Sequence, residues 1–170
     1  MTIIPETPVQ VEVNVQDYFS EESTPLIAIA TWEGWFQRWL DQLKPDFSPH
    51  NQYELSLRLT DDAEIQTFNA QYRQIDKPTD VLAFAALETD YPELDELDAS
   101  PLYLGDIVIS VETAQQQAIA QHHSLQQELA WLAAHGLLHL LGWDHPDDDS
   151  LAQMLQQQAS LLETVGLESE

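Results

Sequence analysis

The sequence predicts a single α/β (α+β) domain with four strands. Three observations support this class: four short segments show strand patterns, the segments between them carry apolar residues at helical spacing, and 170 residues fit one compact domain. We therefore expect one domain over residues 1–170 that carries one functional site.

The first three strands are predicted at residues 9–15, 53–59 and 80–87. The first two alternate apolar and polar residues, as a strand with one buried face does. The third is apolar on both faces, which predicts a strand inside a sheet that is covered on two sides.

Two helices separate these strands. From Thr24, the segment through residue 43 carries its aromatic residues at spacings of three and four, which predicts an amphipathic helix with a buried aromatic face. Pro45 ends this helix. Thr60 and Asp61 are typical caps, so we expect a short helix from there through Tyr72.

The second half begins with residues 88–100, which hold six acidic residues and a proline and should form an exposed loop. Residues 104–110 are a short apolar run of branched residues and should form the fourth strand. A helix over residues 111–123 is expected to follow.

Two further helices are predicted at residues 125–141 and 151–164. Ser124 is the expected N-cap of the first, and Gly142 is expected to end it. The acidic run at residues 147–150 would cap the last helix. We expect the glutamine triplets of these helical regions, and the histidine pair His122 and His123, to be exposed to solvent; the triplets are 115–117 and 156–158.

The formal net charge is −25, from 30 acidic and 5 basic residues. Such a surface repels phosphate backbones at long range, so any RNA-binding role must overcome it. The charge has two open interpretations, solubility alone or a specific basic partner. The chain has no cysteine, which excludes disulfides and thiolate sites and leaves histidine or carboxylate for any metal.

The N-terminal segment lacks the basic region and the apolar core of a secretory signal. The longest strongly apolar stretch, residues 129–143, is too short to span a bilayer. We therefore expect a cytoplasmic protein without a membrane partner.

The motif HGLLHLLGWDH at residues 135–145 carries the clearest chemistry. His135 and His139 are four residues apart, so both imidazoles leave one face of a helix. Gly142 allows a sharp turn, after which His145 supplies a third nitrogen. Three histidines with an open position are typical of a catalytic zinc site. Burial of the histidines in the core is the alternative, and the chelating spacing disfavours it.

The spacing matches the metzincin pattern H-E-x-x-H-x-x-G-x-x-H except at Gly136, where the proteases have glutamate. That glutamate is their general base. Its absence argues against ordinary peptide-bond hydrolysis.

Arg73 and Lys77 lie beside the predicted strand at residues 80–87 and are two of the five basic residues. An arginine next to a core strand in so acidic a chain suggests recognition of a phosphate or a carboxylate. An internal salt bridge is the other interpretation.

With these motifs in view, the chain resembles the bacterial YbeY family of metal-dependent endoribonucleases, which act in ribosomal RNA maturation. The resemblance rests on residues 69–84, 104–110 and 135–145 and covers most of the chain from residue 54 onward. It implies a four-stranded sheet, largely parallel with one antiparallel strand, surrounded by helices.

The resemblance also implies that His135, His139 and His145 bind one zinc ion and that Arg73 and His135 are catalytic. The function expected is a single-strand-specific endoribonuclease in 16S rRNA 3′-end maturation and ribosome quality control, with RNA and ribosomal subunits or ribosome-associated proteins as partners. Zinc would activate water or polarise a phosphoryl oxygen, and Arg73 would stabilise charge on the phosphate. Hydrolysis and internal attack by the 2′-hydroxyl both stay open, and three histidines also accept other divalent ions.

Two alternative functions remain at this stage. One is a zinc-dependent hydrolase of peptides or small molecules, which needs a replacement base and has Glu128 or Asp144 as candidates. Glu128 lies seven residues before His135, two turns away, and is better placed to support the site. The other alternative is a non-catalytic ribosome-assembly factor whose metal serves folding and docking.

Overall fold

The computed structural model describes residues 8–20, 26–48, 50–86 and 101–167. The predicted acidic loop at residues 88–100 lies outside the described residues. The prediction of one domain over residues 1–170 also extends beyond them and stays a prediction.

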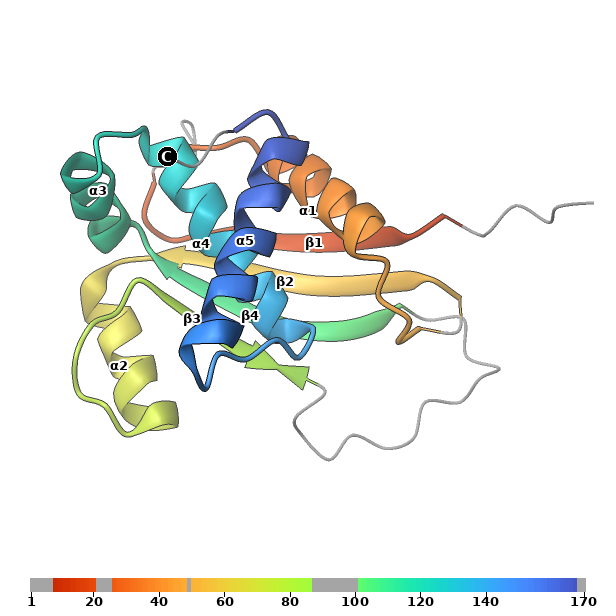
Figure 1. Cartoon of the computed structure of the whole chain (residues 1–170). Coiled ribbons are helices and arrows are strands. Elements are labelled where there is room, and N and C mark those ends of the chain that lie inside the picture. The colour runs from red at the N-terminus through yellow and green to blue at the C-terminus, as the bar shows by residue number, and fades with distance from the viewer. Residues whose placement is uncertain (1–7, 21–25, 49, 87–100, 168–170) are drawn as a thin grey trace, which may run out of the picture.

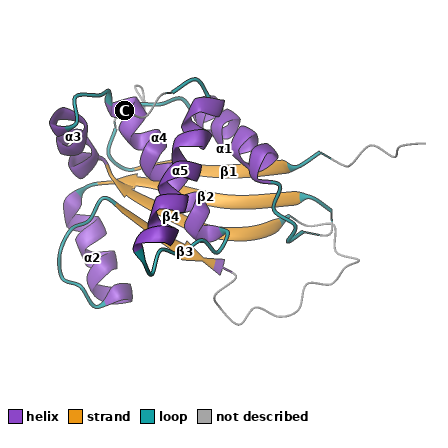
Figure 2. Cartoon of the chain, in the orientation of Figure 1, coloured by secondary structure: helices purple, strands orange, loops and turns teal. Residues whose placement is uncertain are grey.

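The described residues form four strands and five helices, which confirms the predicted α/β class (Figures 1 and 2). In chain order the elements are β1 (Gln10–Asp17), α1 (Ile29–Leu43), β2 (Gln52–Thr60), α2 (Asp62–Arg73), β3 (Val81–Ala85), β4 (Leu102–Ser110), α3 (Val111–Ala120), α4 (Leu125–Leu140) and α5 (Asp148–Thr164). No helix in the described part of the chain has the length and apolar character that a bilayer crossing requires.

The strands form one sheet in the order β1-β2-β4-β3. Strands β1, β2 and β4 are parallel to one another, and β3 is antiparallel to β4, as the family resemblance implied. The register shifts by one residue in β4 at Gly105, whose φ is +140°. A Cβ there would lie 2.2 Å from the carbonyl oxygen of Phe84, so only glycine fits this irregularity.

Helices α1, α4 and α5 cover one face of the sheet, where their apolar side chains join those of the strands in the main core. We call this the inner face. On the opposite, outer face, Ile65 and Phe68 of α2 pack against Leu82, Phe84 and Val108 in a smaller core. The rest of the outer face of β1 and β2 carries polar side chains, since alternate residues are partly buried in β1 and buried in β2.

Strand β3 lies at an edge of the sheet, so its predicted position inside the sheet was wrong. Both of its faces are nevertheless covered. Val81 and Ala83 pack in the main core, whereas Leu82 and Phe84 belong to the smaller core on the outer face. The strand is apolar because each of its faces packs in one of the two cores, and not because it has a neighbouring strand on each side.

Most helix starts match the predicted caps. The side chains of Asp61, Ser124 and Asp147 each accept a hydrogen bond from a backbone N–H in the first turn. Because Asp147 is the N-cap, the last helix begins three residues earlier than predicted. Helix α3 ends before His123 because His122 adopts a left-handed conformation with φ +58°.

Candidate metal centre

Helix α4 places two imidazoles on one face, one turn apart. The Nε2 atoms of His135 and His139 lie 3.0 Å from each other. His145 completes the group, and one nitrogen from each of the three rings lies within 4.8 Å of the others. The three predicted metal ligands are therefore together in space, and among the described residues no carboxylate joins this group.

His145 reaches the other two rings because α4 ends in a tight glycine turn. Gly142 has φ +96°, and its N–H donates to the carbonyl of His139. The N–H of Trp143 donates to the carbonyl of Leu138 at 2.9 Å. These two bonds form a Schellman motif, which reverses the chain and returns it toward the histidines.

The donor set and its spacing fit a divalent metal ion. Two nitrogens bound to one zinc ion at about 2.0–2.1 Å lie roughly 3.3–3.4 Å apart in tetrahedral geometry. The Nε2 atoms of His135 and His139 are 3.0 Å apart, so a small outward movement of the rings would bring them to this separation. Three histidine ligands leave a fourth position for water or substrate, which is the arrangement of catalytic zinc sites.

Burial lowers the pKa of His135 below its ordinary value, because the charged imidazolium loses its hydration there. Burial also lowers the pKa of His139, and repulsion from the other two rings adds to the effect. Both rings are therefore neutral near neutral pH. The neutral ring is the form that binds a metal.

Gln158 of α5 supports the first histidine and was not identified from the sequence. Its side chain is buried, so the predicted solvent exposure of the triplet 156–158 was wrong for this residue. Its Nε2 donates to the carbonyl of Trp131 at 2.8 Å, and its Oε1 lies 3.3 Å from Nδ1 of His135. A sequence signal exists in retrospect, because Gln158 follows Met154 by one turn on the core-facing side of α5.

Gly136 explains how α4 comes so close to the sheet. A Cβ at this position would lie 2.8 Å from a side-chain carbon of Ile107 on β4. A glutamate here would collide with the sheet instead of facing the metal. The departure from the protease pattern is therefore built into the packing of this helix.

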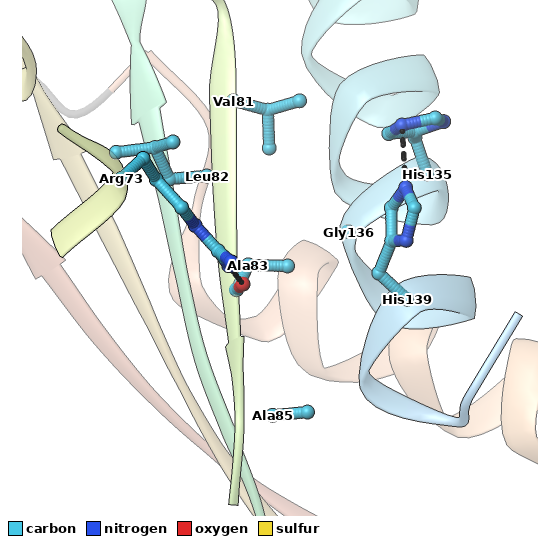
Figure 3. Close-up of a pocket in the computed structure, with 8 residues that line it drawn as sticks. All are labelled: Arg73, Val81, Leu82, Ala83, Ala85, His135, Gly136 and His139. Carbon is cyan, nitrogen blue, oxygen red and sulfur yellow. Dashed lines mark hydrogen bonds between the residues drawn. The ribbon is translucent and has the colours of Figure 1, made fainter. Parts of the chain in front are cut away.

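Arg73 lies at the end of α2 and lines the same cleft as His135 and His139 (Figure 3). The cleft has a volume of about 210 Å³. The Nη2 atom of Arg73 donates to the carbonyl of Ala83 at 2.7 Å, and its guanidinium lies 5.3 Å from the ring centre of Phe84. Among the described residues Arg73 forms no ion pair with a carboxylate, which disfavours the internal salt bridge.

Glu128 is buried on α4 but does not face the metal group. Its Oε2 lies 2.5 Å from Nε2 of His123, whose side chain is 10% exposed, so the predicted exposure of His123 was wrong. Burial raises the pKa of Glu128, and its contact with His123 opposes that rise. Because its carboxylate is held by His123, Glu128 is a poor replacement for the missing protease base.

Known proteins resemble this chain over almost all of its length. The sequence profile of the family "Endoribonuclease YbeY" matches residues 18–166. A protein of that name from Trichormus variabilis is 60% identical over 169 residues, covering 94% of this chain and 96% of its own. Another from Nostoc sp. is 59% identical and covers 94% and 92%, respectively.

The fold also matches a solved structure. The solution structure of TM1509 from Thermotoga maritima superposes with a TM-score of 0.54 at 22% sequence identity. The match covers 91% of this chain and 89% of that one. The two chains therefore share the same fold.

Proposed function

The chain belongs to the YbeY endoribonuclease family, and from this premise we propose that it is a zinc-dependent endoribonuclease that cuts single-stranded RNA. We further propose that it acts in 16S rRNA 3′-end maturation and ribosome quality control. The observation that carries the proposal is the cleft in which His135 and His139 lie with Arg73.

His135, His139 and His145 are the proposed metal ligands. A zinc ion, when bound, supplies Lewis acidity toward a phosphoryl oxygen or a water molecule. Burial holds the rings of His135 and His139 neutral, and Gln158 orients His135. These features keep the nitrogen lone pairs of these two rings available beside the cleft.

Arg73 is the proposed partner of the phosphate. A guanidinium has five N–H donors in a planar fork, and the structure assigns one hydrogen bond of Arg73, to Ala83. The remaining donors can bind two phosphate oxygens and stabilise the charge that develops there in the transition state. The bond to Ala83 and the ring of Phe84 fix the direction of the fork.

The absence of a glutamate at position 136 favours RNA over peptides as the substrate. Peptide hydrolysis at such a site relies on that glutamate as its base. Of the two replacement candidates, Glu128 is bound to His123, and Asp144 accepts a hydrogen bond from the backbone N–H of His145. RNA carries its own nucleophile in the 2′-hydroxyl, so its cleavage does not depend on that base.

The acidic surface favours an enzyme that is recruited to its RNA by other proteins. The protein has a net charge of −25, so it repels free RNA at long range and attracts basic ribosomal proteins. We propose that ribosomal subunits or ribosome-associated proteins deliver the RNA, and that the protein works in the cytoplasm.

The test combines metal analysis with a cleavage assay on single-stranded and duplex RNA. We expect the purified protein to carry about one zinc ion and to cut the single strand. His135→Ala should lose both properties, whereas His122→Asn, which changes an exposed histidine in a left-handed turn, should keep them. Folded, metal-loaded protein that cuts no RNA, even with ribosomal subunits present, would refute the proposal.

A further inference from the structure

A second cavity lies on the outer face of the sheet, away from α4. It has a volume of about 420 Å³, twice that of the metal cleft and within the range of small-molecule sites, roughly 300–1,000 Å³. We call it the outer pocket. Its principal lining residues are Ser56, Arg58, Phe68, Tyr72, Phe84 and Asp106.

One wall of the outer pocket is aromatic. The ring of Tyr72 lies 6.3 Å from that of Phe68 and 5.3 Å from that of Phe84, measured between ring centres. Tyr72 is 54% exposed, so much of its ring is open to a ligand. The wall therefore offers aromatic surface that the protein itself leaves uncovered.

Arg58 lines another side of the outer pocket and holds the aromatic wall in place. Its guanidinium lies 4.1 Å from the ring centre of Tyr18 and 5.5 Å from that of Phe68. It makes two bonds to the carboxylate of Glu64, at 2.6 and 2.9 Å, which fix its plane and neutralise its charge. Because its charge is paired with Glu64, Arg58 is poorly suited to binding a phosphate.

The floor of the pocket is polar and acidic. The hydroxyl of Tyr103 bonds to Asp106 and lies 3.0 Å from Oγ of Ser56. Burial and the contact with Asp106 raise the pKa of Tyr103 to about 12, so this hydroxyl stays protonated. A carboxylate repels a phosphate but accepts hydrogen bonds from N–H groups on a neutral ring.

The outer pocket and the metal cleft adjoin across the edge of the sheet. Val81, Ala83 and Ala85 of β3 line the cleft, whereas Phe84, between them, lines the outer pocket. At the end of α2, Tyr72 borders the pocket and the next residue, Arg73, borders the cleft. In the described part of the chain no strand pairs with the outer edge of β3.

We infer that the outer pocket is a stacking subsite for one unpaired nucleobase of the RNA strand whose phosphate lies at Arg73. This inference rests on the proposed function. Exposed aromatic rings such as that of Tyr72 are surfaces on which unpaired bases stack. A neutral base can enter a pocket with an acidic floor, and a strand crossing the free edge of β3 would place its phosphate at Arg73 and its base against Tyr72.

The experiment measures binding separately from cleavage. A single-stranded hexanucleotide with 2′-O-methyl riboses, which blocks internal attack, is titrated into the full chain and followed by fluorescence anisotropy. We expect Tyr72→Ala to weaken binding by roughly fivefold to a hundredfold, the loss of one base stack, and Tyr72→Phe to bind as the parent does. Phe47→Ala is the matched control, because Phe47 is an exposed ring outside this pocket.

With a cleavable RNA, Tyr72→Ala should raise KM and leave kcat largely unchanged. Equal affinity of the parent and Tyr72→Ala for the hexanucleotide would overturn the inference. A Tyr72→Ala protein that loses affinity for ribosomal proteins but not for the hexanucleotide would also overturn it. The proposed function fails on a different result, the absence of cleavage by metal-loaded protein, which the binding titration does not measure.

Discussion

The side-chain oxygen of Gln158 lies 3.3 Å from Nδ1 of His135 and joins α5 to the metal centre. The orientation of this amide is fixed, because its Nε2 donates to the carbonyl of Trp131. The oxygen must therefore face the ring, where it accepts the Nδ1 proton. With the proton on Nδ1, the Nε2 lone pair of His135 is free for a metal.

Replacing this oxygen should weaken metal binding without removing a ligand. We expect Gln158→Leu, which keeps the approximate volume, to lower zinc affinity by about 10- to 100-fold in a competition titration with a chelator. The matched control is Gln156→Leu, because Gln156 is exposed on the same helix. Unchanged affinity in a folded Gln158→Leu protein would show that the contact does not orient the ring.

Stability of the metal-free protein should depend on the two buried histidines. Burial lowers the folded-state pKa of His135 and His139, whereas their unfolded-state value is about 6.5. Below that value the unfolded chain takes up protons that the folded chain excludes, so the free energy of unfolding falls as pH falls toward the lowered values. Above it, both states are neutral and the effect vanishes.

Denaturant unfolding of metal-free protein at about pH 7.5 and about pH 5 tests this effect against a double variant, His135→Gln with His139→Gln. The raised pKa of Glu128 acts in the opposite direction, because its protonation favours the folded state, but both proteins retain it. We expect the parent to lose more stability than the double variant on acidification. Equal losses would contradict the burial effect.

Two glycines in helices should respond in opposite ways to alanine. A Cβ at Gly136 would meet Ile107 at 2.8 Å, and overpacking of about 1–3 kcal/mol should outweigh a gain in helix propensity of about 1 kcal/mol. Gly34 is exposed on α1 with no atom within 4 Å of an added Cβ, so Gly34→Ala should gain about 0.5–1 kcal/mol. Denaturant midpoints measure both effects, and a stabilised Gly136→Ala protein would contradict the close packing of Gly136 against Ile107.

The grouping of the three histidines could be predicted from the sequence because their placement is local. Two histidines one turn apart and a glycine that ends the helix determine most of the geometry within residues 135–145. Arg73 is distinctive in the sequence because basic residues are rare in this acidic chain, and its catalytic role stays a prediction. Its approach to the histidines depends on the pairing of β3 with β4, which no local pattern encodes.

The missed features are contacts between distant segments. Gln158 meets His135 only because α5 packs on α4, and a glutamine in a polar run gives no sign of burial. His123 was expected to be exposed, yet it turns toward Glu128 across a helix start. The edge position of β3 was missed for a related reason, because burial of both strand faces by helices produces the same apolar pattern as an interior strand.

Arg73→Lys separates the shape of the Arg73 side chain from its charge. The substitution keeps the net charge but replaces the planar fork with a single ammonium, so two phosphate oxygens can no longer be bound in parallel. Loss of such transition-state stabilisation should lower kcat by roughly 10²- to 10³-fold. Arg38→Lys is the matched control: Arg38 is exposed on α1, where it bonds weakly to the carbonyl of Thr164, and the substitution makes the same change in chemistry. Full activity of Arg73→Lys in a single-turnover assay, or equal losses in the two variants, would show that Arg73 contributes only general positive charge.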